Sequence, residues 1–260
     1  MISSPHNPQL KHVRALAGRS KDRRAAGAYL VEGVRLVEAL LDSGQKIENI
    51  YYSDDASNRA VRLIQRLELS GYGCEAVLSS VFKTICETET SQGILAVVKI
   101  PVADSRDMIE DDLILVPDQI RDPGNLGTLL RSAVAAGVTR VIIPPETVDP
   151  YAPKVVRSAM GAHFSLEITP MEWDRIQEVL SGYVVYLAAA DGEIGLWQAD
   201  FHSKAAIIIG GEAEGAGTFA RTVSNVTVSI PMKGKIESLN AGVAGSIILF
   251  EVFRQRSENK

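Results

Sequence analysis

The stretch "IPMKGKIESLNAGVAGSI", residues 230–247, links the end of an apolar strand to the start of the last helix of the chain. The strand-like run ends at Pro231, a polar loop follows, and Ser238 and Asn240 precede a series of small residues. Ser and Asn are good helix N-caps, and small residues allow a helix to pack closely on a neighbour. These effects explain the local form of the stretch, but not the polar loop between two apolar elements.

The composition indicates two domains. A length of 260 residues exceeds the usual size of one domain, and an apolar fraction of 46% is sufficient for two cores. No window is apolar over the length of a membrane span, and the first residues lack the apolar core of a signal peptide. Cys74 and Cys86 lack metal-ligand spacing, as expected for reduced, partly buried thiols. We therefore expect a cytoplasmic protein.

Positive charge is concentrated at the start of the chain, although the whole chain has a formal net charge of -5. Residues 1–24 carry six basic side chains against Asp22 alone, a net charge of +5, so the rest of the chain carries -10. Such a basic arm can bind the phosphates of a nucleic acid, but a solvated N-terminal helix has the same charge pattern. From charge alone both interpretations stay open. The basic residues are Lys11, Arg14, Arg19, Lys21, Arg23 and Arg24.

Strand-like and helical patterns alternate from about residue 28 to the end of the chain. The charged stretch "VADSRDMIEDD", residues 102–112, interrupts them and predicts a linker between a first domain at 1–101 and a second at 113–260. In the second domain, glycine-bounded apolar runs separated by helices predict a mostly parallel sheet covered on both faces. Such sheets bind ligands beyond the carboxyl ends of their strands, so the loops at those ends should carry the chemistry.

The loop "DQIRDPGNLGTLLRS", residues 118–132, follows the first strand of the second domain. Pro123-Gly124 signals a turn, Asn125 is a good N-cap, and Arg131 lies six residues further on. A capping asparagine and a solvated arginine are the purely structural interpretation. The loop is densely polar for a plain turn, which favours a functional role. Its other charged residues are Asp118, Arg121 and Asp122.

The loop "IIIGGEAEGAG", residues 207–217, follows a buried strand and holds four glycines around Glu212 and Glu214. Glycine allows backbone N–H groups to approach a ligand closely. A Walker A motif is excluded, because Ala216 stands where its lysine is required. The segment "GAGTFA", residues 215–220, matches the dinucleotide pattern, but it starts several residues after the strand and no ribose-binding acid ends the next strand. A nicotinamide-dependent enzyme is therefore only an alternative.

Together the three loops resemble the SpoU (TrmH) family of RNA ribose 2'-O-methyltransferases in the SPOUT group. The family motif N-x-G-x-x-x-R is present as Asn125, Gly127 and Arg131, and the glutamate-centred loop as "GGEAEGAG". The signature IPM-x-G-x-x-x-SLN is complete at residues 230–240. One departure is Gly242-Val243, where the family often has Ser-Val. In the first domain, "NPQLKHVRAL" and "YLVEGVRLVEALL" are similar to the family's N-terminal substrate-binding domain.

This resemblance implies an α/β fold with two parts: a C-terminal trefoil-knotted, mostly parallel sheet domain, and a smaller N-terminal α/β ribosomal-protein-like RNA-binding domain. It also implies a homodimer with active sites near the subunit interface, S-adenosylmethionine as cofactor, and no metal for the transfer. The implied cofactor contacts are Gly210, Ile230 and Leu239. The implied catalytic residues are Asn125, Arg131, Glu212, Ser238 and Asn240. The expected RNA contacts in the basic arm are Lys11, Arg14, Arg23 and Arg24.

The expected activity is methyl transfer to a ribose 2'-hydroxyl of structured RNA. A guanidinium stays protonated in proteins, so we expect Arg131 to hold the target phosphate and stabilise charge on the ribose oxygen. The asparagines and Ser238 would orient the arginine, and Glu212 would order the glycine loop. The separate N-terminal domain favours ribosomal RNA. The alternatives are transfer RNA, a resistance enzyme acting on ribosomal RNA, and a non-catalytic ribosome assembly factor.

Overall fold

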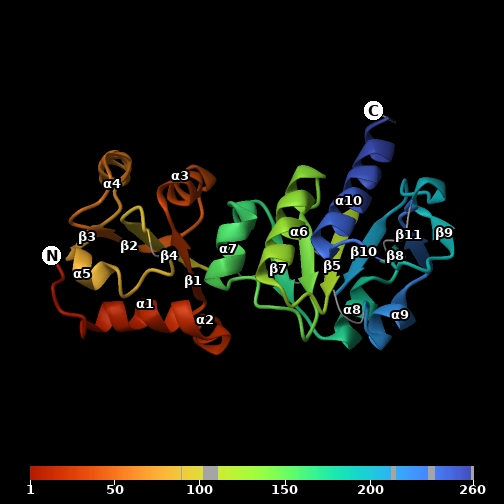
Figure 1. Cartoon of the computed structure of the whole chain (residues 1–260), viewed down its shortest axis with the longest axis horizontal. Coiled ribbons are helices and arrows are strands. Elements are labelled where there is room, and N and C mark those ends of the chain that lie inside the picture. Colours follow the sequence, from red (N-terminus) through yellow and green to blue (C-terminus); the bar gives the residue numbers. More distant parts are fainter. Residues whose placement is uncertain (89, 102–110, 212–214, 234–237, 259–260) are drawn as a thin grey trace. The chain divides into compact units, whose positions relative to one another are not determined.

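The computed structural model describes residues 1–88, 90–101, 111–211, 215–233 and 238–258. By their internal contacts the residues form two compact units, Met1–Pro101 with Tyr151–Phe164, and Val102–Pro150 with Ser165–Lys260. Each unit has its own sheet with helices around it, so the predicted α/β fold is confirmed (Figure 1). None of the helices in the described ranges is long and apolar enough to span a membrane.

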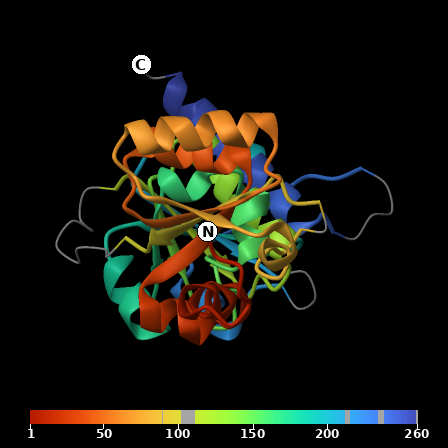
Figure 2. The ribbon, with the colours of Figure 1, turned by 90° about the vertical axis from the view of Figure 1, so that its left-hand side faces the viewer.

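The first unit contains a four-stranded mixed sheet. In spatial order its strands are β1 (Ala28–Glu32), β4 (Ile94–Lys99), β2 (Ile47–Ser53) and β3 (Cys74–Val77). Its helices before residue 101 are α1 (Pro8–Gly18), α2 (Ser20–Ala26), α3 (Val34–Ser43), α4 (Asn58–Leu69) and α5 (Ser79–Phe82). β4 is antiparallel to β1 and β2, and β2 is parallel to β3. Figure 2 shows α1 and α4 on opposite faces of this sheet.

The basic arm is a folded part of the first unit. Leu10, Val13 and Leu16 recur at helical spacing on α1 and join the buried core with Leu95 of β4. Asn7 is the N-cap of α1, because its Oδ1 accepts the Gln9 N–H at 2.8 Å. The exposed basic side chains therefore stand on an ordered helical surface.

The segment Tyr151–Phe164 groups with the first unit, although the sequence pattern placed it in the second domain. It contains α7 (Pro153–Ala159) and the 3-10 turn η1 (Ala162–Phe164), and α7 packs against β1. The rings of Tyr29 and Tyr151 lie 5.0 Å apart between centroids. This aromatic contact is long-range in sequence, so periodicity could not reveal it, and the grouping by contacts differs at this segment from the predicted second domain at 113–260.

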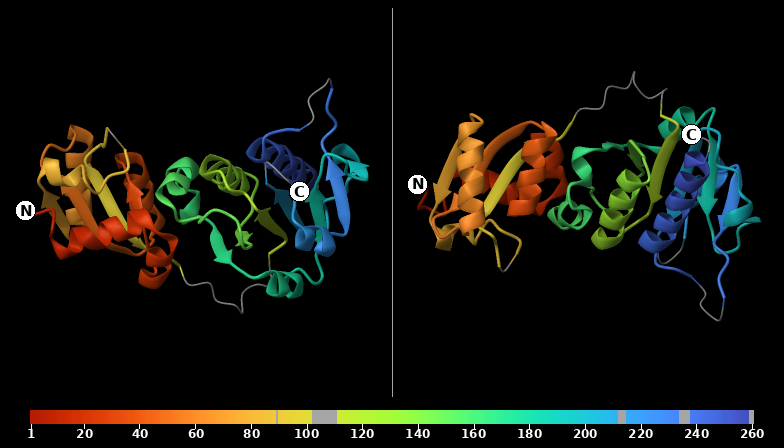
Figure 3. Two further views of the ribbon diagram at one scale, coloured as in Figure 1. Left: turned by 60° about the horizontal axis from the view of Figure 1, so that its bottom comes forward. Right: turned by 90° about the horizontal axis from the view of Figure 1, so that it is seen from above.

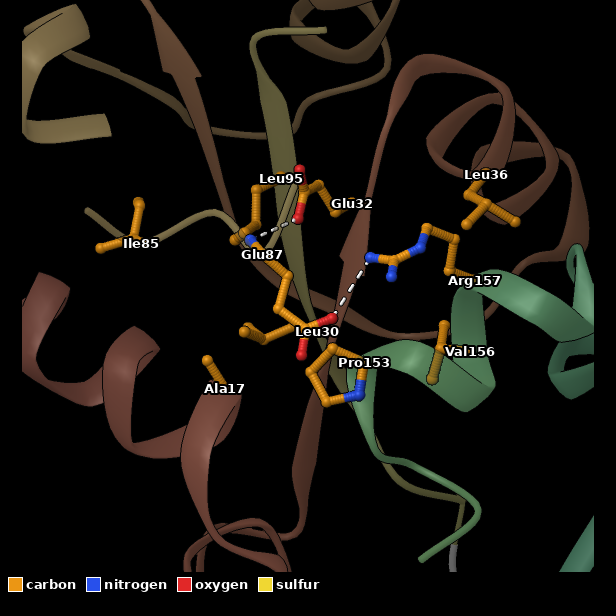
Figure 4. A pocket seen from close by; sticks show the side chains of 10 residues that line it. All are labelled: Ala17, Leu30, Glu32, Leu36, Ile85, Glu87, Leu95, Pro153, Val156 and Arg157. Carbon is orange, nitrogen blue, oxygen red and sulfur yellow. Dashed lines mark hydrogen bonds and ion pairs between the residues drawn. The ribbon is translucent and has the colours of Figure 1, made fainter. Parts of the chain in front are cut away.

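An ion pair also holds α7 within the first unit. Arg157 Nη1 lies 3.2 Å from Glu87 Oε2, and the Glu87 N–H donates to Glu32 Oε2 at 3.0 Å (Figure 4). The cavity beside these residues has a volume of about 10 Å³. Such a volume holds one water molecule at most, so this hollow is a packing feature and not a ligand site.

The second unit contains a seven-stranded sheet. In spatial order its strands are β7 (Glu167–Pro170), β6 (Arg140–Ile143), β5 (Leu113–Asp118), β10 (Ala205–Gly210), β8 (Val184–Ala188), β11 (Val226–Ser229) and β9 (Ile194–Gly195). All strand pairs among the described residues of this second unit are parallel, which confirms the predicted sheet type. The sequence pattern does not reveal β7 or β9, because β7 has only one buried residue, Ile168, and β9 has only two residues.

Helices cover both faces of the parallel sheet. α6 (Pro123–Ala135) and α10 (Ala241–Ser257) pack side by side on one face (Figures 1 and 3). α8 (Trp173–Val179) and α9 (Thr218–Val223) lie on the other face, and the 3-10 turn η2 covers Leu196–Gln198. Ile114 and Val116 of β5 belong to the buried cluster that includes Ile176 of α8 and Ala220 of α9. Burial on both faces explains why these strands read as continuous apolar runs.

Candidate functional site

A cavity of about 380 Å³ lies at the carboxyl ends of the central strands of the parallel sheet. Its walls come from the ends of β8 and β10, from residues that follow β11, and from the start of α10. All three predicted cofactor residues, Gly210, Ile230 and Leu239, line this cavity, as does the predicted catalytic Ser238. The fold thus brings together predicted positions from two separate loops, 207–217 and 230–240, at the edge where parallel sheets bind ligands.

Glycine backbone forms one wall of the cavity. β10 ends at Gly210, and the next residue, Gly211, donates its N–H to the Gly215 carbonyl at 3.1 Å. A Cβ on Gly210 would stand 2.4 Å from the Ala216 nitrogen, and one on Gly211 would stand 2.3 Å from the Gln119 carbonyl oxygen. Because these neighbours are backbone atoms, only glycine fits at both positions. The glycine spacing is therefore explained by close packing of this wall, without a dinucleotide motif.

Two predicted catalytic residues, 115 positions apart, form a direct hydrogen bond: Asn240 Nδ2 donates to Asn125 Oδ1 at 2.8 Å. Asn240 is also the N-cap of α10, since its Oδ1 accepts the Val243 N–H at 3.2 Å. The N-cap of α6 is Asp122, whose Oδ1 accepts the Asn125 N–H at 2.8 Å. The capping role considered for Asn125 is therefore wrong, and its side chain instead meets Asn240.

Close packing between α6 and α10 brings the two asparagines within reach. A Cβ on Gly245 would stand 2.2 Å from Leu129 Cδ2, so a larger residue would require the Leu129 side chain or the helix to move. Ser132 Oγ and Ser246 Oγ share a hydrogen bond of 2.7 Å across the same interface. This confirms the packing role expected for the small residues after Asn240. A Cβ at Gly242, where the family often has serine, would lie a tight 3.2 Å from Thr128.

The other predicted catalytic residues have different surroundings. Arg131 lies on α6, six residues beyond Asn125, and is exposed. Ser238 is exposed at the cavity. Glu212 lies outside the described residues. Arg131 is thus accessible to a large substrate, whereas Asn240 is engaged in hydrogen bonds within the protein.

Two charged residues that the motifs did not single out also line the cavity. Asp191 follows the end of β8, and Arg221 lies on α9. Arg221 Nε donates to the Ala216 carbonyl at 3.3 Å, which places its guanidinium beside the glycine wall. For Asp191 the only sequence signal is its place after a parallel strand, and Arg221 sits in a short helix with no signal of its own.

The four predicted RNA contacts of the basic arm differ in exposure. Lys11 and Arg24 are exposed. Arg14 is half-buried and donates to the Pro5 carbonyl at 2.6 Å. Arg23 is only 3% exposed, and its Nη1 donates to the Leu16 carbonyl at 2.6 Å. Arg23 therefore joins α2 to the end of α1, and its predicted RNA contact is withdrawn.

The two thiols have no reactive character. Cys74 and Cys86 are free and partly buried, as predicted. Burial raises the pKa of Cys74 to about 11 and that of Cys86 to about 12, so both stay protonated at neutral pH. Within the described residues, no group of three or more His, Cys, Asp or Glu side chains is arranged to hold a metal ion.

A ligand cavity beyond the carboxyl ends of parallel strands, bordered by hydrogen-bonded polar side chains, defines an α/β enzyme domain. The model of the SpoU rRNA Methylase family matches residues 112–250, more than half of the chain. The model of an MRM3-like substrate binding domain matches residues 7–96. The chain therefore belongs to the SpoU rRNA methylase family, and the family resemblance seen in the three loops is confirmed.

Relatives are similar along nearly the whole chain. The 23S rRNA (uridine(2479)-2'-O)-methyltransferase of Streptomyces viridochromogenes is 32% identical over 96% of this chain and 91% of the relative. The 23S rRNA (guanosine(2553)-2'-O)-methyltransferase RlmP of Bacillus subtilis is 30% identical over 96% of this chain and 98% of the relative. The crystal structure of the SpoU methyltransferase AviRb from Streptomyces viridochromogenes, in complex with the cofactor AdoMet, has a TM-score of 0.86 and 29% identity over 97% of this chain and 99% of that chain.

Proposed function

We propose that this chain transfers a methyl group from S-adenosylmethionine to a ribose 2'-hydroxyl of ribosomal RNA. This proposal rests on one observation: the first residues of α10 and those just before it both line the cofactor cavity and contact Asn125, a predicted catalytic residue. Leu239 and Ala241 line the cofactor-sized cavity, and Asn240 between them bonds to Asn125. The full-length relatives are named as 23S rRNA 2'-O-methyltransferases, and a structural neighbour was solved with AdoMet.

The cavity fits S-adenosylmethionine in size and in the chemistry of its walls. Its volume of about 380 Å³ lies within the range of about 300–1,000 Å³ that is usual for small-molecule sites. Ile230 and Leu239 offer apolar side chains for the adenine, and Gly210 allows its backbone to come close. Asp191 and Arg221 carry charges opposite to those of the ammonium and carboxylate groups of the methionine part.

When bound, the cofactor would supply a methyl group on a positively charged sulfur: the S–C bond breaks, an O–C bond forms, and the hydroxyl proton passes to water or to a phosphate of the RNA. The protein therefore has to align the ribose hydroxyl and make its oxygen more nucleophilic. Arg131 is exposed and stays protonated, and it can hold a phosphate beside the target ribose while it stabilises negative charge on the oxygen. Asn240 is bonded through both amide atoms, to Val243 and to Asn125. We therefore propose that Asn125 faces the substrate and that Asn240 holds the Asn125 side chain in place.

A methyl-transfer assay tests the proposed reaction and its substrate. Labelled S-adenosylmethionine is incubated with protein-free ribosomal RNA or transfer RNA, and the methylated nucleotide is then mapped. We expect a 2'-O-methyl group in ribosomal RNA. Label in transfer RNA alone would favour the alternative substrate, and cofactor binding without transfer to either RNA would favour a non-catalytic assembly factor.

The proposed enzyme is a homodimer in which a second copy covers α10. Val243, Phe250 and Phe253 are 46%, 47% and 45% exposed, and they follow one another along that helix. The rings of Phe250 and Phe253 meet edge to face at 6.3 Å. Large apolar side chains gathered on an outer helix face are typical of an interface. Arg131 is exposed on the adjacent α6, so an interface on this face would lie close to the active site.

Replacement of Phe250 by aspartate tests this interface. A charge at a buried interface position is unfavourable, so Phe250→Asp should shift the protein from dimer to monomer in sedimentation velocity. The matched control is Phe219→Asp on α9, because Phe219 is 61% exposed away from α10. An unchanged dimer in Phe250→Asp would place the interface elsewhere.

Charge reversal in the basic arm tests its contact with RNA. The double variant Lys11→Glu with Arg24→Glu should weaken RNA binding. The plot of log affinity against log salt should also become less steep, with the magnitude of its slope smaller by about two, one for each lost phosphate contact. The control is Lys46→Glu with Arg62→Glu, which changes two exposed cations elsewhere in the first unit. Equal salt slopes in both double variants would show that the arm is a bystander.

The resemblance to the SpoU family carries two further proposals. The first is the trefoil knot in the second unit. The second is a cytoplasmic location, because ribosomal RNA is the substrate named for the bacterial relatives.

A further inference from the structure

Asp118 is a buried carboxylate at the end of the central strand β5. It pairs in register with Gly210 of β10 and is 1% exposed. Its Oδ2 accepts the Gly217 N–H at 2.7 Å. Its Oδ1 is also buried and has no hydrogen-bond partner among the described residues. The family motifs assign this residue no role, and the proposed methyl transfer does not use it.

This arrangement lowers the stability of the fold. Burial raises the pKa of the Asp118 carboxyl, the Gly217 N–H acts in the opposite direction, and Glu146 raises the pKa further. A folded-state pKa above the unfolded one means that folding favours the protonated acid. The ionised carboxylate therefore reduces the free energy of unfolding at pH values above the raised pKa. A buried charge that is retained at such a cost is a candidate for a functional role.

The bond to Asp118 ties the segment Gly215–Gly217 to the end of β5. Gly215 and Ala216 line the cofactor cavity together with Gly210. The fit around them is tight, since a Cβ on Gly217 would stand 2.6 Å from Gln119 Nε2. Gly210 and Ala216 are also in close contact, since a Cβ on Gly210 would stand 2.4 Å from the Ala216 nitrogen. Movement of Gly217 away from Asp118 would therefore displace Ala216 and open one wall of the cavity.

We infer that Asp118 is a positioning residue for the cofactor: its carboxylate holds Gly217, and through it Gly215 and Ala216, in the conformation that receives S-adenosylmethionine. This inference rests on the proposed function. Asp118 is not among the residues that line the cavity, so it acts through the backbone of the glycine wall and not by direct contact.

The test measures two properties of Asp118→Asn and Asp118→Ala. These are the affinity for S-adenosylmethionine by calorimetric titration and the melting temperature of the cofactor-free protein. Asparagine keeps an acceptor for Gly217 but replaces a charge-assisted hydrogen bond by a neutral one, so affinity should fall about fivefold. Its melting temperature should be unchanged or higher, because a buried charge is removed. Alanine loses the acceptor, and affinity should fall about tenfold or more. Asp174→Asn, an exposed carboxylate on α8, is the control that should change neither property.

A positioning role predicts that Asp118→Asn lowers the affinity for S-adenosylmethionine while the melting temperature stays the same or rises. A merely structural role would lower both. Wild-type affinity in both Asp118 variants would overturn the inference. A loss of affinity in Asp118→Asn that only accompanies a lower melting temperature would also overturn it. If the unaltered protein does not bind S-adenosylmethionine at all, the proposed function fails instead.

Discussion

Arg131→Ala is expected to lower the rate of methyl transfer by about 10³-fold or more, while the affinity for S-adenosylmethionine stays within about twofold. Arg131 is exposed on α6 and is not among the residues that line the cofactor cavity, so its loss leaves the cavity walls intact. The lost guanidinium would no longer hold the phosphate or stabilise charge on the ribose oxygen. Single-turnover transfer to RNA, combined with calorimetric titration of the cofactor, measures both effects.

Two further variants sharpen this experiment. Arg131→Lys keeps the positive charge but loses the planar fork of donors, so it should recover only part of the rate. Arg175→Ala removes an exposed arginine of α8 and should keep the full rate. Normal turnover in Arg131→Ala would exclude the proposed role of this arginine. A parallel loss of cofactor affinity would show that the arginine acts on the cavity.

Gly210→Ala is expected to weaken S-adenosylmethionine binding by about 10- to 100-fold. The added Cβ would stand 2.4 Å from the Ala216 nitrogen and 2.6 Å from the Gly215 carbonyl carbon, so the backbone of the cavity wall has to move. Overpacking of this kind costs about 1–3 kcal/mol, and each 1.4 kcal/mol corresponds to a tenfold change in affinity. Calorimetric titration with the cofactor measures the change directly.

Controls separate this effect from a general loss of structure. Gly73→Ala adds a methyl group where no atom lies within 4 Å of the new Cβ, and it should bind the cofactor normally. Ile230→Ala shortens an apolar wall without a clash, so it should also reduce affinity even if Gly210→Ala proves poorly folded. Unchanged affinity in both cavity variants would mean that the cofactor binds elsewhere.

Much of the fold could be predicted from local patterns. The parallel strands β5, β6, β8 and β10 show as apolar runs, because helices cover both faces of the sheet. The short strand β9 and the edge strand β7 do not. The contacts that group Tyr151–Phe164 with the first unit could not be predicted, because they join this segment to Tyr29 and Glu87, more than 60 residues away in sequence.

In the candidate site, too, some residues could be predicted from local motifs and others only from the structure. Motif spacing pointed to Gly210, Ile230 and Leu239, and the structure places all three at one cavity. Charge counting in the basic arm could not distinguish the exposed Arg24 from the buried Arg23, because both are arginines in one short helix. Asp118 looked like one more polar loop residue until its burial and its bond to Gly217 were known.

The sequence by itself determined the fold class, the family and the loops at 207–217 and 230–240 that border the cavity, because apolar periodicity, glycine spacing and motif order are local properties of a chain. Only the tertiary structure decided that Asn240 caps α10 and bonds to Asn125, that Asp122 caps α6, and that Asp118 holds the glycine wall. Each of the two longer-range bonds joins residues about a hundred positions apart, and it forms because the parallel sheet gathers its strand ends at one edge.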